Sequence, residues 1–502
     1  MSHNMAPADM ETGAGSSKPV DDDGRPRRTG TAWTASAHII TTVLGSGVLS
    51  LAWGVAQLGW VAGPGVMTLF AAVIYYTSAL LADCYRTGNP VSSPRNRTYM
   101  AAVRATLGGS MVKLCGAVQF INLVRFGIGI TIAASVSMMA IKEAGCFHRK
   151  GHKANCRSSS KSLYIAIYGI MEIFLSQIPG LESVWWLSML ATVMSCTYSI
   201  IGISLCVAQS VANGGIQGGL TGVAVGINAA GKSVTVMDKV WRSLQAFGNM
   251  AFAYAFSIVL LEIQISPSLL CSESICPCLE NTGCKIYEDS VDTLKAGPPS
   301  EAKVMKKATA VSVAVTTVIY LLCECVGYAA FGDTAPDNIL TGFGFYEPFW
   351  LLDLANAAVA VHLVGTYQVI TQPIFAYVEL RAAAAWPDNA FVGTMHVRLW
   401  PSGVHVAVCP LQLIGRTVYV CLTTGVAMAM PFFGSVVGLI GAVSFWPLTV
   451  YFPVSMYIVR RQVPRGRTRW LLLQALSAVC LLVSVAAAAG SIADVVAEFR
   501  RR

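Results

Sequence analysis

The chain has 502 residues, of which 54% are hydrophobic and 12% are charged, and its formal net charge is +9. This charged share is about half that of an ordinary soluble protein, which argues against a soluble enzyme. Lys, Arg, Asp and Glu are absent from residues 29–82, 417–459 and 470–493. Because a membrane-crossing helix needs about 20 apolar residues, the composition predicts a polytopic membrane protein. The basic residues are scattered between spans and indicate no nucleic-acid partner.

Apolar runs and helix-breaking residues divide the chain into eleven expected spans. They lie at about 32–56, 60–82, 114–141, 162–179, 184–208, 243–263, 308–331, 349–373, 417–433, 436–458 and 470–493. The predicted fold is therefore all-α. Residues 1–30 are polar and are expected to form a disordered tail without a cleavable signal. Spans 1–6 occupy 31–263, a loop occupies 264–307, spans 7–11 occupy 308–493, and 494–502 form a short tail.

The distribution of basic residues predicts a cytosolic N-terminus. On that topology the inner segments carry 22 of the 35 Lys and Arg residues and the outer segments carry 12, although segment 142–161 carries six and opposes the rule. The sequon at Asn96 then lies in an inner loop and should remain unmodified.

Two cysteines lie close together in the polar segment 142–161. Cys146 and Cys156 are ten residues apart, and this segment faces the oxidising exterior on the predicted topology. A disulfide is the favoured interpretation, and two free thiols are the alternative.

Span 1 contains small residues at its middle, Gly45, Ser46 and Gly47, and His38 lies two turns earlier on the same face. Such a triplet is a natural place for a helix to break. Backbone amides at a break are tolerated where they line a cavity, and a half-helix N-terminus attracts an anion such as a carboxylate. The alternative is that the small residues allow close helix packing.

Span 6 contains a second possible interruption, with Gly248, Asn249, Phe252 and Tyr254. Paired broken helices at corresponding positions of two halves indicate the binding site of a secondary transporter. Spans 1 and 6 correspond if spans 1–5 and 6–10 are inverted repeats. An ordinary packed helix remains the alternative.

Ionisable residues inside spans are functional hypotheses, because they are expensive to bury in a bilayer. His362 lies near the middle of span 8, and both His362 and His38 could exchange protons or could be neutral, hydrogen-bonded core residues. Asp353 is expected to cap the end of span 8, and Glu172 is expected to be structural. Arg125 and Glu324 have opposite charges and are expected to form an ion pair. The alternative is that Arg125 enters the substrate site, where it would favour acidic substrates or block binding.

Several long strings closely resemble those of plant amino acid permeases. They are residues 37–41, 45–53, 176–179, 299–303, 327–333, 352–357 and 445–453. The resemblance implies a proton-coupled symporter of the plasma membrane with a LeuT-like fold of inverted five-helix repeats plus one extra span. It also implies that the backbone at Gly45–Gly47 holds the substrate carboxylate and that Gly248–Tyr254 borders its side chain. Asn122 could line the pocket, and His38 and His362 become the proton-linked candidates.

The chain departs from the family pattern at four places. Residues 265–291 look like an insertion, Asn249 stands where the family tends to have aspartate, and Arg125 and Glu324 stand where it tends to have glycine. The insertion holds Cys271, Cys276, Cys278 and Cys284, whose spacing without histidine does not match a zinc site, so no metal is expected.

The leading functional hypothesis is the import of amino acids, neutral and in one version also acidic, driven by the proton gradient without a cofactor. The alternatives are a transport-inactive relative or amino acid sensor, and a carrier of a related substrate such as auxin. Residues 226–233 match a phosphate-binding loop by chance, because no strand-and-helix unit surrounds them. No nucleophile and acid combine into a catalytic set, so an enzyme is not expected.

Overall fold

The computed structural model describes residues 31–501 except 87–95, 97, 152, 154, 155, 157–159, 179–184, 228–232, 255–300, 345–347, 388, 394 and 399–404. Its helices in chain order are α1 (Ala32–Val43), η1 (Ser46–Ser50), α2 (Leu51–Asp83), α3 (Tyr99–Leu107), α4 (Gly109–Lys150), α5 (Lys161–Ser176), α6 (Trp185–Ala212), α7 (Val236–Ala253), α9 (Glu301–Phe331), η3 (Gly332–Thr334), η4 (Ile339–Thr341), α10 (Phe349–Ala385), α11 (Pro410–Ala429), α12 (Phe433–Ser444), η5 (Phe445–Tyr451), α13 (Phe452–Arg460) and α14 (Thr468–Arg501). Two antiparallel hairpins pair β1 (Gly226–Ile227) with β2 (Ser233–Val234) and β3 (Met395–Arg398) with β4 (His405–Val408).

Each of the eleven expected spans falls on a helix, so the prediction of an all-α polytopic protein is confirmed. Within the described ranges, eight helices are long and apolar enough to cross a membrane. The other three expected spans are shorter or more polar. α1 has only 12 residues because the helix is interrupted after Val43. α5 has 16 residues, and α7 begins with a polar first turn.

Two expected boundaries do not coincide with helix ends. The expected tail 494–502 continues α14 as far as Arg501, and the helix of span 7 starts at Glu301, inside the expected loop 264–307. Both stretches carry charged residues, which helices accommodate where they extend past the hydrocarbon core. The expected N-terminal tail and the insertion 265–291 lie outside the described residues.

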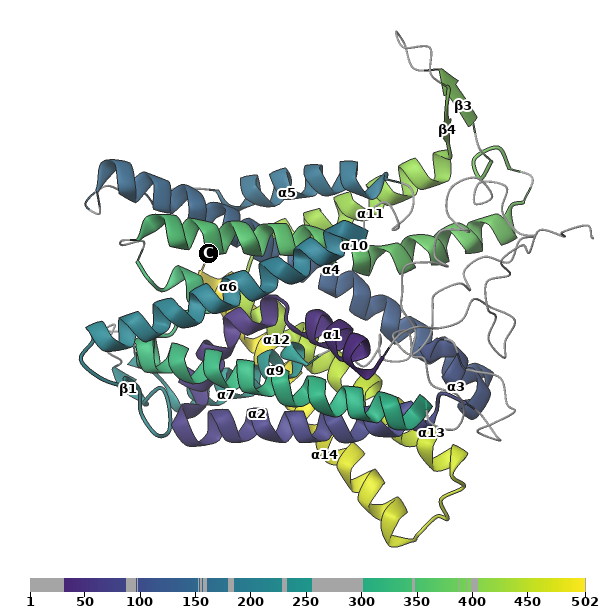
Figure 1. Ribbon diagram of the computed structural model, residues 1–502, viewed down its shortest axis with the longest axis horizontal. Helices are drawn as coiled ribbons and strands as arrows, with labels where there is room; N and C mark the ends of the chain where they lie inside the picture. Colours follow the sequence, from purple (N-terminus) through teal and green to yellow (C-terminus); the bar gives the residue numbers. More distant parts are fainter. Residues whose placement is uncertain are drawn as a thin grey trace, which may run out of the picture.

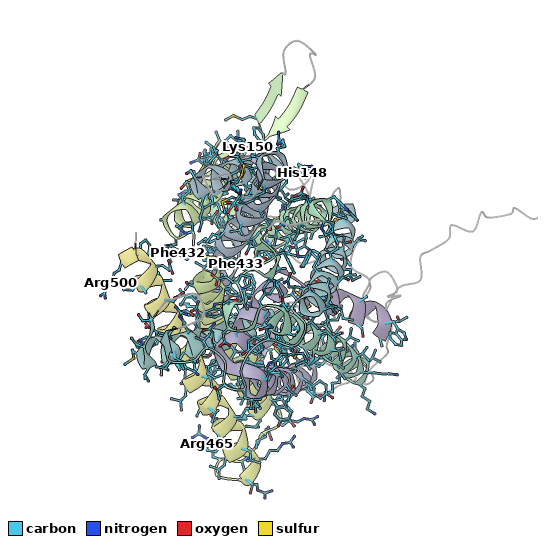
Figure 2. The ribbon with its side chains drawn as sticks, turned by 90° about the vertical axis from the view of Figure 1, so that its left-hand side faces the viewer. His148, Lys150, Phe432, Phe433, Arg465 and Arg500 are labelled. Atoms are coloured by element: carbon cyan, nitrogen blue, oxygen red, sulfur yellow. A yellow bond between two sulfur atoms is a disulfide. The ribbon has the colours of Figure 1, made fainter. Side chains whose placement is uncertain are left out.

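The helices pack into two groups that lie side by side (Figure 1). In one group, α2 packs on α9 and α7, α1 packs on α9, and both α12 and α14 pack on α7. In the other, α10 packs on α4 and α6, while α5 packs on α11 and α4. The hairpin β3–β4 stands clear of both groups in the two views (Figures 1 and 2).

Spans 1 and 2 are joined at Gly59, where the backbone leaves the helical region. Gly59 has a φ of 85°, which a residue with a side chain rarely adopts, and a Cβ there would lie 2.3 Å from Leu220 O. Trp60 donates from its backbone N to Gly219 O over 3.3 Å and from Nε1 to Gln217 O over 3.1 Å. The segment that follows α6 is therefore fixed over the turn between the first two spans.

Span 10 changes from α-helix to π-helix at η5. Pro447 lies inside this stretch and lacks a backbone N–H. The preceding residue, Trp446, bonds to α14. Its backbone N donates to Ser484 Oγ over 3.2 Å, and its Nε1 donates to Ser477 Oγ over 3.1 Å. The interruption of span 10 thus anchors it to span 11.

Two features of the loops match the sequence analysis. Cys146 and Cys156 form a disulfide, which ties the end of α4 to the segment that precedes α5. Asn96 is buried, and its Nδ2 donates to Cys84 O over 2.8 Å. An amide engaged in this way is a poor acceptor for a glycan.

One buried ion pair joins α10 to α11. Arg416 Nε donates to Glu379 Oε1 over 2.9 Å, Arg416 Nη1 donates to Ser176 O over 2.9 Å, and both charged side chains are 9% exposed. Gln412 also donates to Glu379 Oε2 over 3.1 Å. The pair therefore links α5, α10 and α11.

Replacing Glu379 by Gln should lower the free energy of unfolding by about 3 kcal/mol, because the Arg416 charge stays buried without its counter-ion. Denaturation of the purified protein in detergent measures this change. Asp83→Asn is the matched control, since the Asp83–Lys306 pair spans 2.7 Å but its side chains are 14% and 35% exposed. The control should lose at most about 1 kcal/mol. Equal losses in the two variants would contradict the assignment.

Candidate functional site

The predicted break in span 1 is present. α1 ends at Val43, Leu44 and Gly45 are not helical, and η1 starts at Ser46. Gly45 is extended, with φ −118° and ψ −164°. The first amides of a helix have no partner within that helix, so the start of η1 offers N–H groups to an anion. Residues 45–47 therefore interrupt the helix, and Gly47 also allows a close approach to Phe252 and Ala253.

The helix of span 6 ends beside this break. α7 begins with a capping box between Thr235 and Asp238 and ends at Ala253, after which Tyr254 leaves the helical region with φ −106° and ψ 23°. A Cβ on Gly47 would lie 3.1 Å from Phe252 Cδ1 and 3.2 Å from Ala253 Cα. The C-terminal end of α7 and the first turn of η1 are thus in direct contact. The continuation of span 6 lies outside the described residues.

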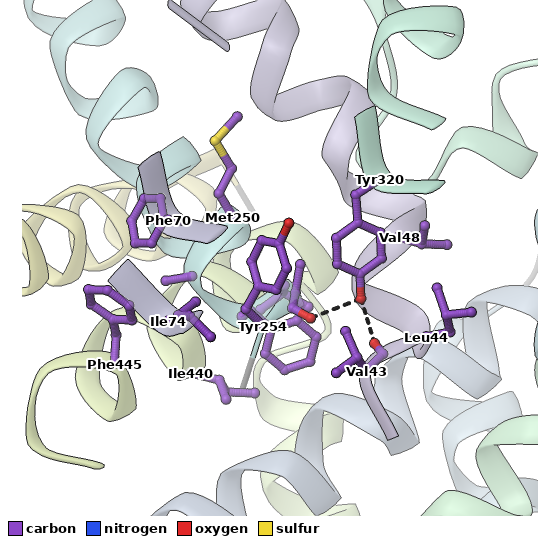
Figure 3. Packing of buried hydrophobic residues seen from close by; sticks show 14 of the residues in the cluster. Val43, Leu44, Val48, Phe70, Ile74, Met250, Tyr254, Tyr320, Ile440 and Phe445 are labelled. Carbon is purple, nitrogen blue, oxygen red and sulfur yellow. Dashed lines mark hydrogen bonds between the residues drawn. The ribbon is translucent and has the colours of Figure 1, made fainter. Parts of the chain in front are cut away.

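Tyr320 of α9 holds both helix ends, as Figure 3 shows. Its hydroxyl lies 2.5 Å from Val43 O and 2.9 Å from Ala253 O, and the side chain is fully buried. One O–H group therefore serves the terminal carbonyls of α1 and of α7. Sequence reasoning missed this residue. The only available signal was a tyrosine in the middle of span 7, whose hydroxyl needs a partner when it is buried.

His362 lies on the other side of the break. Its Nδ1 is 2.9 Å from Ala191 O, so Nδ1 carries the proton when the ring is neutral and Nε2 is the basic nitrogen. A Cβ on Gly45 would lie 3.9 Å from Nε2, and Thr366 Oγ1 lies 3.3 Å from the same atom. The basic nitrogen of His362 is therefore adjacent to the non-helical residue of span 1. His38 lies in α1, but its side chain is outside what the structure describes.

The other predicted residues divide between two surroundings. Phe252 stacks on Phe126 of α4 with ring centroids 5.0 Å apart, and Asn122 lies one turn before Phe126. Tyr254 Oη is 2.6 Å from Thr317 Oγ1. Gly248, by contrast, packs against α12, since a Cβ there would lie 2.3 Å from Gly438 O.

Two buried asparagines next to this region have no hydrogen-bond partner among the described residues. Asn122 and Asn249 are each 1% exposed, and both amide atoms of each side chain are unsatisfied. A Cβ on Gly438 would lie 2.8 Å from Asn249 Oδ1, so Asn249 faces α12 rather than the break. Buried amides normally find partners, which makes these two candidates for contact with a ligand or with water.

The expected ion pair between Arg125 and Glu324 does not form. Glu324 is fully buried, and neither of its carboxyl oxygens has a partner among the described residues. Arg125 Nε also lacks one. The two residues lie on α4 and α9, which belong to different helix groups. Sequence separation and charge alone could not show on which side of each helix they lie.

The described ends of segment 226–233 do not match a phosphate-binding loop. Ser233 pairs with Ile227 in the short hairpin β1–β2, whereas such a loop would place it at the start of a helix. The part of the chain that is described contains no group of three or more His, Cys, Asp or Glu that could hold a metal ion. The four cysteines of segment 271–284 lie outside it.

A carboxyl group between α9 and α10 lies close to the start of α12. A Cβ on Gly434 would be 3.0 Å from Asp337 Oδ2. Desolvation by the surrounding protein, together with the negative charges of Asp494 and Glu498, raises the pKa of Asp337 to about 6. This end of the bundle therefore changes its charge in mildly acidic solution.

Replacing Gly47 by Val should abolish amino acid uptake while leaving surface expression intact. The branched side chain would collide with Phe252 and Ala253 and would force the ends of η1 and α7 apart. Radiolabelled uptake with surface biotinylation measures both quantities. Gly65→Val is the matched control, because a Cβ on Gly65 meets nothing within 4 Å, and it should retain uptake. Normal uptake by Gly47→Val would remove this break from the site.

Comparison with known proteins assigns the chain to a family. The family model described as "Transmembrane amino acid transporter protein" matches residues 28–266 and 291–497, and the gap between them falls within the expected insertion. Amino acid permease 3 of Arabidopsis thaliana is 53% identical over 486 residues, covering 97% of this chain and 95% of the relative. Amino acid permease 2 of the same plant is 52% identical, covering 96% and 91%.

A solved structure titled "Inward facing conformation of Mhp1" is similar over 97% of this chain and 94% of its own, with a TM-score of 0.48 and 12% identity. The predicted resemblance to plant amino acid permeases is confirmed by the relatives. The chain belongs to the family of transmembrane amino acid transporter proteins and, within it, to the plant amino acid permeases.

Proposed function

We propose that this protein imports L-amino acids together with protons across the plasma membrane, with its N-terminus in the cytosol. The proposal rests on the junction where η1 contacts the end of α7, next to the Tyr320 hydroxyl. The names of the relatives support an amino acid as the substrate. Coupling to protons is our inference from the position of His362.

The junction offers opposite partial charges to the two ends of a zwitterion. Gly45 N donates to Val43 O over 2.8 Å, whereas the amides of Ser46 and Gly47 and the positive dipole end of η1 favour the carboxylate of an amino acid. The carbonyls at the ends of α1 and α7 present the negative ends of two helix dipoles, which favour its ammonium group. An amino acid is therefore a better match for this junction than auxin, which has no ammonium group.

The surroundings of the junction favour neutral side chains. The stacked rings of Phe126 and Phe252 offer apolar surface, and Asn122 adds an amide without an internal partner. Arg125 precedes Phe126 on α4 and is the nearest cation along that helix. It provides a physical route to accepting an acidic side chain as well.

His362 is positioned to couple the proton to the substrate. Its basic Nε2 is adjacent to Gly45, so a proton taken up there places a positive charge near the substrate carboxylate. His38, which lies in α1, is the second proton-linked candidate. Moving a neutral amino acid with a proton carries charge inward, and the membrane potential contributes about 2.3 kcal/mol per charge per 100 mV.

Uptake of radiolabelled L-amino acids should rise at acid external pH and collapse with a protonophore, in cells that lack their own permeases. In His362→Gln the acid stimulation should weaken, because glutamine cannot take up the proton that His362 binds. His148→Gln is the control. His148 lies at the end of α4, where it packs edge-on against Phe349 of α10, and its replacement should not affect the stimulation. Substrate binding without any uptake, despite surface expression, would favour a sensor or a transport-inactive relative instead.

A further inference from the structure

Glu324 is a buried carboxyl group with no partner for either oxygen among the described residues. Two other buried glutamates of this chain have a partner for at least one carboxyl oxygen, although Glu172 Oε1 lacks one among the described residues. Glu172 Oε2 accepts from Gln368 Nε2 over 2.6 Å, and Glu379 pairs with Arg416. Burying a polar group without a hydrogen bond is costly, and burying an unpaired ion costs far more. Packing alone does not account for a glutamate at this position.

The face of α9 that carries Glu324 lies along span 1. Ser312 Oγ donates to Ser36 O over 3.1 Å, Tyr320 Oη bonds Val43 O, and a Cβ on Gly327 would lie 2.6 Å from Ala52 Cβ. Glu324 is four residues after Tyr320 and three before Gly327, so it shares their face of the helix. It therefore lies opposite residues 44–50, the broken part of span 1.

No cation in the described surroundings compensates a charge on Glu324. α6 and the stretch of α2 from Leu51 to Ala82 contain no Lys, Arg, Asp or Glu, and neither does α1. The charged residues of α7 belong to its first two turns, at the opposite end from Ala253. The described titratable side chains that interact electrostatically with Glu324 are Tyr254, Cys323 and Cys325. A charged carboxylate at this position would have no counter-ion among these described neighbours.

We propose that Glu324 is a second proton-binding site of the transport cycle, so that each amino acid moves with two protons, one on His362 and one on Glu324. The inference rests on the proposed function and deepens it. Glu324 would bind its proton while the surrounding helices shield the carboxyl from water. It can release the proton when the segment moves and water reaches the carboxyl.

The experiment measures proton and amino acid fluxes together in proteoliposomes that contain the purified full-length protein. A pH-sensitive dye reports the proton flux, and radiolabelled L-alanine reports the amino acid flux. Other neutral L-amino acids replace alanine if alanine is not carried. In Glu324→Gln the ratio of protons to amino acids should fall about twofold, because one of two sites no longer titrates. Exchange of labelled for unlabelled amino acid, which needs no net proton movement, should remain within about twofold of the original protein.

Glu172→Gln is the matched control. It changes an equally buried glutamate, bonded to Gln368 between α5 and α10, and should leave the flux ratio unchanged. If Glu324→Gln fails to fold, Glu324→Gly supplies a second variant without the carboxyl. An unchanged flux ratio in a folded variant overturns the inference and leaves the proposed function standing. Uptake by the original protein without any proton movement overturns the proposed function itself.

Discussion

A single hydroxyl group, that of Tyr320, is bonded to the last carbonyls of two helices that stop inside the membrane. Backbone groups released at a helix end have no water to bond with in a bilayer, so each must find a partner within the protein. Tyr320 supplies that partner to α1 and α7 at once. These two bonds fix where the two broken helices end relative to α9.

Glycines allow the helices to come close enough for this arrangement. Gly47 leaves room for Phe252 and Ala253, and Gly248 leaves room for the backbone of Gly438 in α12. The contact between α7 and α12 places the Phe252 ring against Phe126 of α4, which belongs to the second group of helices. The same close packing that positions the ends of α1 and α7 therefore also joins the two helix groups next to the site.

Much of this arrangement could be predicted from the sequence, because it depends on local chemistry. The triplet Gly45–Gly47 weakens a helix wherever it occurs, and the charge-free runs mark the spans regardless of how these pack. The partners of Tyr320 and the separation of Arg125 from Glu324 depend on the rotation of each helix about its own axis. Periodicity shows which residues share a face, but it does not show which neighbour that face meets. Long-range contacts of this kind required the structure.

The placement of His362 and Glu324 on either side of one broken segment has a thermodynamic consequence. If closure of the segment removes water from both groups, each proton that binds favours the closed state, and closure in turn favours binding of each proton. An amino acid whose carboxylate bonds the amides of Ser46 and Gly47 favours closure by the same reasoning. Substrate and protons then assist one another without touching, because all three act on residues 44–50. In the proposed function, the helix break would therefore be both the binding site and the element through which the protons are coupled to the substrate.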